Sequence, residues 1–169
     1  MKKLLFMTAV AVLSMLAACA NAKTDNANDE AESEAVEEVA DAQSGATHYS
    51  GKVRDLTMKK YNHYIFNTET NDGKFLGTHP IVIDFYATWC GPCKQLSPKL
   101  EALAKDFKGK IDFFRVDVDE ETKLAQMFNI EAMPTLVYFD GNGNITGTSV
   151  GLLTTDELQA NINKYCLKK

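Results

Sequence analysis

The sequence contains few residues of the kinds that would place it in a specialised class. Its 169 residues include only four cysteines, four prolines and three histidines. Because only two of the cysteines lie close together in sequence, the chain is not a disulfide-rich scaffold. The apolar run near the start, residues 4–16, is shorter than the roughly 20 residues that a transmembrane helix needs. What remains is the composition of an ordinary globular domain.

Negative charge is concentrated in one segment near the N-terminus. The formal net charge is −5, and residues 20–46 hold eight Asp and Glu side chains against the single Lys23. From residue 47 onward, 15 Lys and Arg balance 15 Asp and Glu, so the sequence has no basic surface typical of a nucleic-acid-binding protein. Residues 20–46 have no aromatic side chain and cannot build a core. We predict an acidic flexible spacer over residues 19–46.

Residues 1–18 have the features of an export signal peptide, since two lysines precede the apolar run and small residues follow it. The run Leu16-Ala17-Ala18-Cys19 resembles the bacterial lipobox, whose cysteine receives a diacylglyceryl group and becomes the mature N-terminus. Several acyl chains on Cys19 would anchor the protein stably to a membrane. We expect a periplasmic, lipid-anchored protein. The alternative is a soluble periplasmic protein after ordinary signal cleavage, because Ala18-Cys19-Ala20 also fits a small-x-small site.

Residues 47–169 are expected to form one domain of alternating strands and helices. Residues 81–87 are almost continuously apolar and β-branched, as in a central strand that is buried on both faces, and Asp84 is the anomaly within it. The other patterns predict strands at 53–56, 111–118, 135–139 and 144–150, and helices at 57–66, from Cys90 to near Gly109, at 120–128 and from Thr154 onward. The predicted order is βαβαβαββα.

Two thiols three positions apart, Cys90 and Cys93, stand at the predicted start of a helix. On adjacent turns of one helix face they can close a small disulfide ring. Unpaired N–H groups and the helix dipole favour the thiolate of Cys90, which is expected to be the attacking nucleophile. Cys93, one turn further in, is expected to be less exposed and to resolve the mixed disulfide. Gly91 permits close approach of a substrate backbone, and Pro92 is tolerated this early in a helix.

A bare Cys-x-x-Cys pair could also be half of a zinc site. Such a site needs four ligands, and the sequence has no second cysteine pair. The histidines, His48, His63 and His79, all precede the pair and show no ligand spacing. We therefore expect neither a metal nor a cofactor.

The run from Phe85 to Lys94, Phe-Tyr-Ala-Thr-Trp-Cys-Gly-Pro-Cys-Lys, resembles the signature of the thioredoxin family. The resemblance covers roughly residues 50–167. It implies the thioredoxin fold, an α/β architecture in which a central mixed five-stranded sheet has helices on both faces. It also implies a monomeric protein-disulfide oxidoreductase that works through Cys90 and Cys93.

The resemblance also implies roles for residues outside the signature. Asp84, six positions before Cys90, matches the family's buried aspartate, which helps to move a proton from the second cysteine. Its burial in an apolar strand predicts a raised pKa. Pro134, 44 positions after Cys90, matches the substrate-facing cis-proline and is predicted to be cis. Together with a third loop, the implied substrate-binding residues are Trp89, Gly91, Pro92, Met133, Pro134, Val150 and Gly151.

The sequence also departs from the usual pattern of the family. Arg115 occupies a position where many thioredoxins have a lysine near the buried aspartate, and Met133 replaces a more usual isoleucine. The loop at 67–80 is longer than in a minimal thioredoxin. Pro98 matches a proline that kinks the active-site helix. Cys166 lies on the apolar stripe of the last helix, where we expect a buried, inert thiol.

The sequence indicates disulfide exchange more clearly than it indicates whether the protein reduces or oxidises its substrates. The Gly-Pro pair resembles reducing thioredoxins near about −270 mV rather than oxidants near about −120 mV, a gap of about 7 kcal/mol. Reduction outside the cytosol requires a membrane electron donor; without one, the protein could stay oxidised and donate disulfides. A cytochrome c maturation reductase is a rival, although such proteins usually carry an insertion before the cis-proline loop. A binding protein with idle cysteines is a further alternative.

Overall fold

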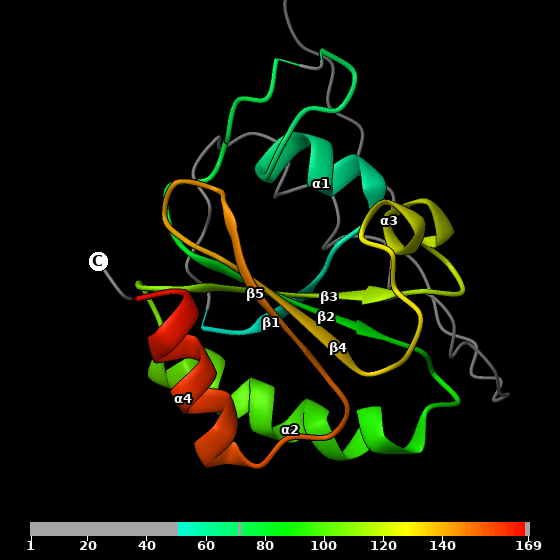
Figure 1. Cartoon of the computed structure of the whole chain (residues 1–169), viewed down its shortest axis with the longest axis vertical. Helices are drawn as coiled ribbons and strands as arrows, with labels where there is room; N and C mark the ends of the chain where they lie inside the picture. Colours follow the sequence, from blue (N-terminus) through cyan, green and yellow to red (C-terminus); the bar gives the residue numbers. More distant parts are fainter. Residues whose placement is uncertain (1–50, 71, 168–169) are drawn as a thin grey trace, which may run out of the picture. The chain divides into compact units, whose positions relative to one another are not determined.

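Five strands form one mixed sheet in the computed structural model, which describes residues 51–70 and 72–167. The strand order is β1-β3-β2-β4-β5 (Figure 1). Strands β1, β2 and β3 are mutually parallel, whereas β4 runs antiparallel to both β2 and β5. The strands are β1 (Val53–Asp55), β2 (Ile81–Tyr86), β3 (Asp112–Asp117), β4 (Thr135–Phe139) and β5 (Ile145–Val150). The predicted mixed five-stranded sheet is confirmed.

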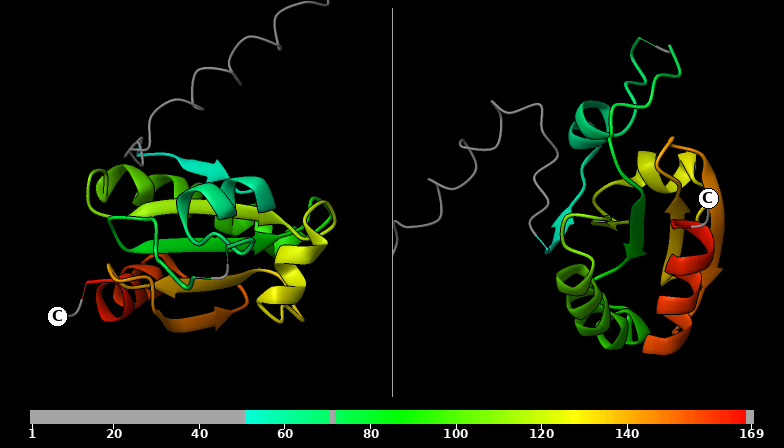
Figure 2. Two further views of the ribbon diagram at one scale, coloured as in Figure 1. Left: turned by 90° about the horizontal axis from the view of Figure 1, so that it is seen from above. Right: turned by 90° about the vertical axis from the view of Figure 1, so that its left-hand side faces the viewer.

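Helices cover both faces of this sheet. In Figure 1, α2 and α4 lie on one side of the strands and α1 and α3 on the other, and Figure 2 shows α2 and α4 side by side. The helices are α1 (Met58–Tyr64), α2 (Gly91–Asp106), α3 (Thr122–Met127) and α4 (Thr155–Tyr165). The order of elements is βαβαβαββα, as predicted from the apolar patterns.

Two apolar cores result, one on each face. Under α2 and α4, side chains of the sheet such as Val82 and Tyr138 pack with Leu96, Leu100 and Ile162. The opposite core, under α1 and α3, is rich in aromatic rings. Because both cores press on β2 and β4, every residue of β4 and all but the last residue of β2 are buried. This burial fixes the position of the strand that leads to the cysteine pair.

Polar side chains determine where the helices begin. The Thr57 hydroxyl accepts a hydrogen bond from the backbone N–H of Lys60 at the start of α1. Thr154 and Glu157 form a reciprocal capping box at the start of α4. The predicted helix at 120–128 is shorter in the structure because Glu121 still donates its N–H to the carbonyl of Asp117 in a turn. Predicted and observed boundaries differ by only a few residues elsewhere.

The predicted signal peptide, the lipidation site at Cys19 and the acidic spacer lie outside the described residues. Among residues 51–70 and 72–167, no helix combines the length and the apolar composition that crossing a bilayer requires. The active-site helix α2 contains Pro98, as predicted, which has no N–H to donate to the preceding turn.

Candidate active site

The two neighbouring cysteines form a disulfide where β2 gives way to α2. The Cα atoms of Cys90 and Cys93 are 5.3 Å apart, and the two sulfurs are bonded. Cys90 is the N-cap of α2 and has an extended backbone, while Pro92 occupies the first turn, where its missing N–H costs nothing. The Cys90 sulfur accepts a hydrogen bond from the backbone N–H of Cys93 at 3.2 Å. The chain thus presents Cys90 at the positive end of a helix dipole.

The predicted difference in exposure between the two cysteines is nearly absent in the disulfide form. Cys90 is 5% exposed and Cys93 is 3% exposed. Ala87 is buried with them, and Met133 packs against the pair, which encloses both sulfurs. Cys93 is the less exposed of the two, as expected, but the difference is small in this state. A clearer asymmetry is the hydrogen bond that the Cys90 sulfur accepts, because the same N–H would favour a thiolate at that atom once the disulfide is reduced.

The surface next to the disulfide is open. Trp89 is 65% exposed, and Gly91 and Pro92 are also exposed. A Cβ atom added to Gly91 would meet nothing within 4 Å, so the glycine leaves room for another chain. The Trp89 indole N–H donates to the Asp119 carboxylate at 2.8 Å, which holds the ring at the rim of the site.

The loop before β4 brings the other predicted substrate-facing residues together. The peptide bond between Met133 and Pro134 is cis, as predicted. The backbone N–H of Gly151 donates to the carbonyl of Pro134 at 2.8 Å, and Val150 pairs with Thr135 across β4 and β5. Val150 is 62% exposed, so an apolar side chain stands uncovered beside this loop.

Asp84 lies in the middle of β2 and is buried. Its Oδ1 atom has no hydrogen-bond partner among the described residues. Burial raises the pKa of Asp84 to about 7, against a smaller lowering effect of the Arg115 charge. A cavity of about 260 Å³ joins Asp84 to the active site; it is lined by Asp84, Tyr86, Ala87, Thr88, Cys93, Lys94, Ser97 and Arg115. The carboxyl group and the inner cysteine therefore share one cavity.

Arg115 lies opposite Asp84 in the β2–β3 register, yet its hydrogen bond goes elsewhere. Its Nε donates to Asp55 on β1 at 2.6 Å. The guanidinium also lies over the Tyr86 ring, 5.7 Å from the ring centroid. The predicted proximity of residue 115 to the buried aspartate is thus confirmed, but its direct partner is Asp55.

Comparison with known proteins identifies this arrangement. The model of the thioredoxin family, described as "Thioredoxin", matches residues 53–164. The chain belongs to the thioredoxin family. Its cysteine pair is therefore the redox centre of a thiol–disulfide oxidoreductase, an enzyme that acts on protein disulfides.

Individual thioredoxins support the same assignment. The thioredoxin of Borreliella burgdorferi is 40% identical over 111 residues, which is 65% of this chain and 94% of that protein. The thioredoxin of Malassezia sympodialis is 46% identical over 90 residues, 53% of this chain and 84% of that protein. The fold is also similar to that of a thioredoxin from the same fungus in its crystal structure. The TM-score between the two structures is 0.56 at 36% sequence identity, and the match covers 68% of this chain and 91% of that one. The family model begins at residue 53 and so leaves the N-terminal segment unmatched.

Two partners in this thioredoxin site were missed by the sequence analysis. Asp119, which holds Trp89, lies in an acidic turn after β3 and is positioned by its own backbone N–H, which donates to Asp117 at 3.0 Å. Asp55, which binds Arg115, ends the short edge strand β1. Neither residue has a local sequence signal. The contact of Asp119 joins positions 30 residues apart, and the contact of Asp55 joins positions 60 residues apart.

The remaining cysteine of the domain takes no part in the site. Cys166 is a free, buried thiol that packs in the core under α2 and α4, and burial raises its pKa to about 12. The prediction that this thiol is buried is confirmed. Within residues 51–70 and 72–167, no three His, Cys, Asp or Glu side chains are grouped in a way that could hold a metal ion.

Proposed function

We propose that this thioredoxin reduces disulfides of exported proteins from a lipid anchor on the periplasmic side of a membrane, using the Cys-Gly-Pro-Cys dithiol. The observation that carries the chemical part is the shared cavity of Asp84 and Cys93 behind a Cys90 sulfur that receives a backbone N–H. Export and anchoring are proposed from the N-terminal sequence, which ends its apolar run at the lipobox-like cysteine, Cys19.

The reaction runs in two exchange steps. In the reduced protein, the Cys90 thiolate attacks one sulfur of a substrate disulfide, forms a mixed disulfide and releases the other substrate sulfur as a thiolate. The Cys93 thiol then loses its proton and attacks the Cys90 sulfur. The bond between Cys90 and the substrate breaks, and the second substrate thiol leaves. The substrate has gained two electrons and two protons, and the protein ends in the disulfide form that the structure contains.

Asp84 is the proposed acceptor of the Cys93 proton. A carboxyl group with a pKa of about 7 is part ionised at neutral pH, so it can take up a proton and release it again. The two groups line the same cavity, which allows transfer through water. Within the described part of the chain, no other carboxyl group lines this cavity.

Substrates are proposed to bind across the open rim between Trp89 and Val150. Both side chains are more than half exposed and offer apolar contact, while Met133, in the loop before β4, packs against the cysteines. Backbone contacts and exposed apolar side chains recognise many unfolded or extended segments rather than one sequence. This surface suits a broad set of protein disulfides.

The membrane anchor can be tested by replacing Cys19. When cells producing the full chain are extracted with a detergent that separates into two phases on warming, the wild-type protein should collect in the detergent phase because of its acyl chains. A Cys19→Ser variant should collect in the aqueous phase or retain its signal peptide. Cys166→Ser is the matched control and should partition like the wild type. Aqueous partition of the wild-type protein would instead support ordinary signal cleavage.

The direction of electron flow can be tested in living cells. Acid quenching followed by alkylation with a mass-tagged maleimide reports whether the two active-site cysteines are thiols or a disulfide at steady state. A reductase that is supplied by a membrane donor should be found mainly as the dithiol. A Cys90→Ser, Cys93→Ser double variant gives the background labelling of the other two cysteines. A population that is mainly disulfide would contradict the reductase proposal and favour a disulfide donor.

A further inference from the structure

Three charged side chains stand in one row across the sheet. In the strand register, Asp55 of β1 pairs with Arg115 of β3, and Arg115 pairs with Asp84 of β2. Directly paired residues of neighbouring strands project from the same face of a sheet. The next position in the row, on β4, is the apolar Leu136. Arg115 therefore stands between two carboxyl groups on the face that α2 covers.

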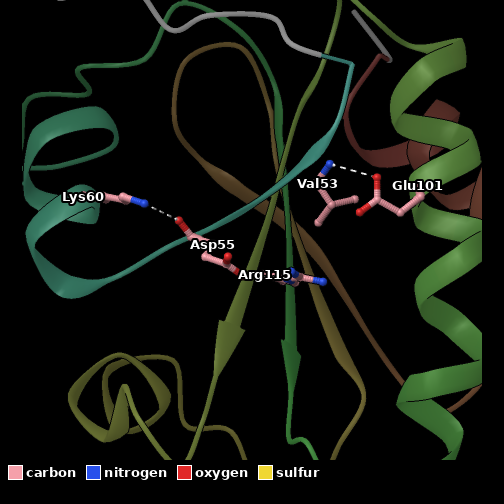
Figure 3. Close-up of polar contacts among 5 residues, drawn as sticks. All are labelled: Val53, Asp55, Lys60, Glu101 and Arg115. Atoms are coloured by element: carbon pink, nitrogen blue, oxygen red, sulfur yellow. Dashed lines mark hydrogen bonds and ion pairs between the residues drawn. The ribbon is translucent and has the colours of Figure 1, made fainter. Parts of the chain in front are cut away.

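The carboxyl groups of Asp55 and Asp84 lie in very different environments. The Asp55 side chain is 64% exposed and forms the ion pair with Arg115, whereas Asp84 is only 3% exposed and keeps one oxygen without a partner. Figure 3 shows Asp55 on the edge strand β1 next to Arg115 of the neighbouring strand β3. The cation thus binds the outer carboxylate and leaves the inner one unpaired.

We propose that Asp55 is a positioning residue, which holds Arg115 in an ion pair at the edge of the sheet and so prevents the guanidinium from closing on Asp84. This inference rests on the role proposed above for Asp84 as the proton acceptor of Cys93. It explains why a strongly basic side chain can line the same cavity as Asp84 without forming a hydrogen bond with the Oδ1 atom.

Other groups also contact Arg115 or act on its charge. The Tyr86 ring lies beneath its guanidinium, and the negative charge of Glu101 on α2 also acts on it. Figure 3 shows Glu101 reaching from α2 to β1, where its carboxylate accepts the N–H of Val53 at 3.4 Å. On the other side of β1, the Lys60 ammonium donates to the backbone carbonyl of Asp55 at 3.3 Å. These contacts fix the short edge strand that carries Asp55.

Few charged or titratable groups face Asp84 itself. Arg115 comes from β3, while Cys93 and Lys94 come from α2, and Tyr86 lies two positions along β2 in the same cavity. A half-exposed ion pair contributes little stability on its own. A weak ion pair with Asp55 is nevertheless enough to keep Arg115 away from Asp84, because moving the guanidinium inward would also cost desolvation energy. If Arg115 did reach Asp84, the carboxylate would be favoured and would become a weaker base for Cys93.

The test is a titration of Asp84 in the oxidised full chain, followed by carbon-13 NMR of labelled aspartate. Asp55→Ala should lower the pKa of Asp84 by about one pH unit, the lower end of the effect of a neighbouring opposite charge. The midpoint of the pH dependence of insulin reduction should move to lower pH by a similar amount. Asp55→Glu, which can remake the ion pair, should restore the wild-type values.

A double variant separates positioning from a direct charge effect. If Asp55 acts through Arg115, adding Asp55→Ala to an Arg115→Gln chain should leave the pKa of Asp84 unchanged. The same fall in both backgrounds would show that only the charge of Asp55 matters, and would overturn the inference. An unchanged pKa in the single Asp55→Ala variant would also overturn it. Because the titration needs no turnover, a shifted pKa in a chain that reduces no insulin would support the positioning role and count only against the proposed function.

Discussion

A Cys93→Ser variant of the full chain is expected to accumulate mixed disulfides with its substrates through Cys90. The first exchange step needs only the sulfur at the N-terminus of α2, whose thiolate is favoured by the helix dipole and by a backbone N–H. Without the second thiol, the mixed disulfide cannot be resolved. Non-reducing electrophoresis should show adducts that disappear on reduction, and mass spectrometry should identify their partners. Insulin reduction should fall to the background rate.

The matched variant is Cys90→Ser, which should form no such adducts although it retains Cys93. Cys166 gives no background because it is buried and its pKa is raised to about 12. A Cys90→Ser, Cys93→Ser chain controls for any adducts formed by Cys19. Adducts that appear with Cys90→Ser and not with Cys93→Ser would reverse the two assigned roles. Their absence from both variants would favour a binding protein with idle cysteines.

Replacing Asp84 with asparagine should remove a large pH dependence from the stability of the oxidised protein. Burial raises the pKa of Asp84 from an ordinary value of 3.8 to about 7 in the folded state. Between these values the unfolded chain has lost the proton and the folded chain still holds it, so the free energy of unfolding falls as pH rises. The difference in pKa corresponds to about 4 kcal/mol, present in full below pH 4 and lost by about pH 8.

Denaturant unfolding of the wild type and Asp84→Asn at pH 4 and pH 8 measures this effect. The change between the two pH values should be about 4 kcal/mol smaller in the variant, since contributions of other groups cancel in the comparison. The same variant should reduce insulin more slowly, by about tenfold to a hundredfold, at or below the lower end of general acid–base catalysis. An equal pH dependence in both proteins would refute the raised pKa. At neutral pH the buried Asp84 thus lowers the stability of the wild-type fold, and the same group is the proposed base for Cys93.

Strong local patterns allowed most of the fold to be predicted. The apolar run at 81–87 and the strand at 135–139 identified β2 and β4 almost to the residue, because both are buried on two sides and carry no competing signal. Thr154 gave the start of α4 because its capping box lies within four residues. The cysteine pair was evident from its own spacing, while the roles of Asp84 and Pro134 came from the resemblance to the thioredoxin family.

Contacts between distant residues could not be predicted in this way. The ion pair of Asp55 with Arg115 depends on β1 lying beside β3, and the hold of Asp119 on Trp89 depends on the turn after β3 reaching the start of α2. The nearly equal burial of Cys90 and Cys93 also depends on Met133, which packs against the pair from a loop 40 or more residues away. Local sequence patterns give no information about which residues far apart in the chain lie close together in the fold.

The burial of Cys166 determines how many thiols of the described domain can take part in electron transfer. Its thiol is buried in the core below α4, and its raised pKa leaves almost no thiolate at physiological pH. It therefore cannot capture the mixed disulfide that Cys90 forms, and it cannot shuffle with the active-site bond. Among the described residues, Cys90 and Cys93 form the one disulfide, and Cys166 is the one free thiol. Under the proposed reductase function, each turnover therefore moves two electrons through this one cysteine pair, and the pair has to be reduced again before the next turnover.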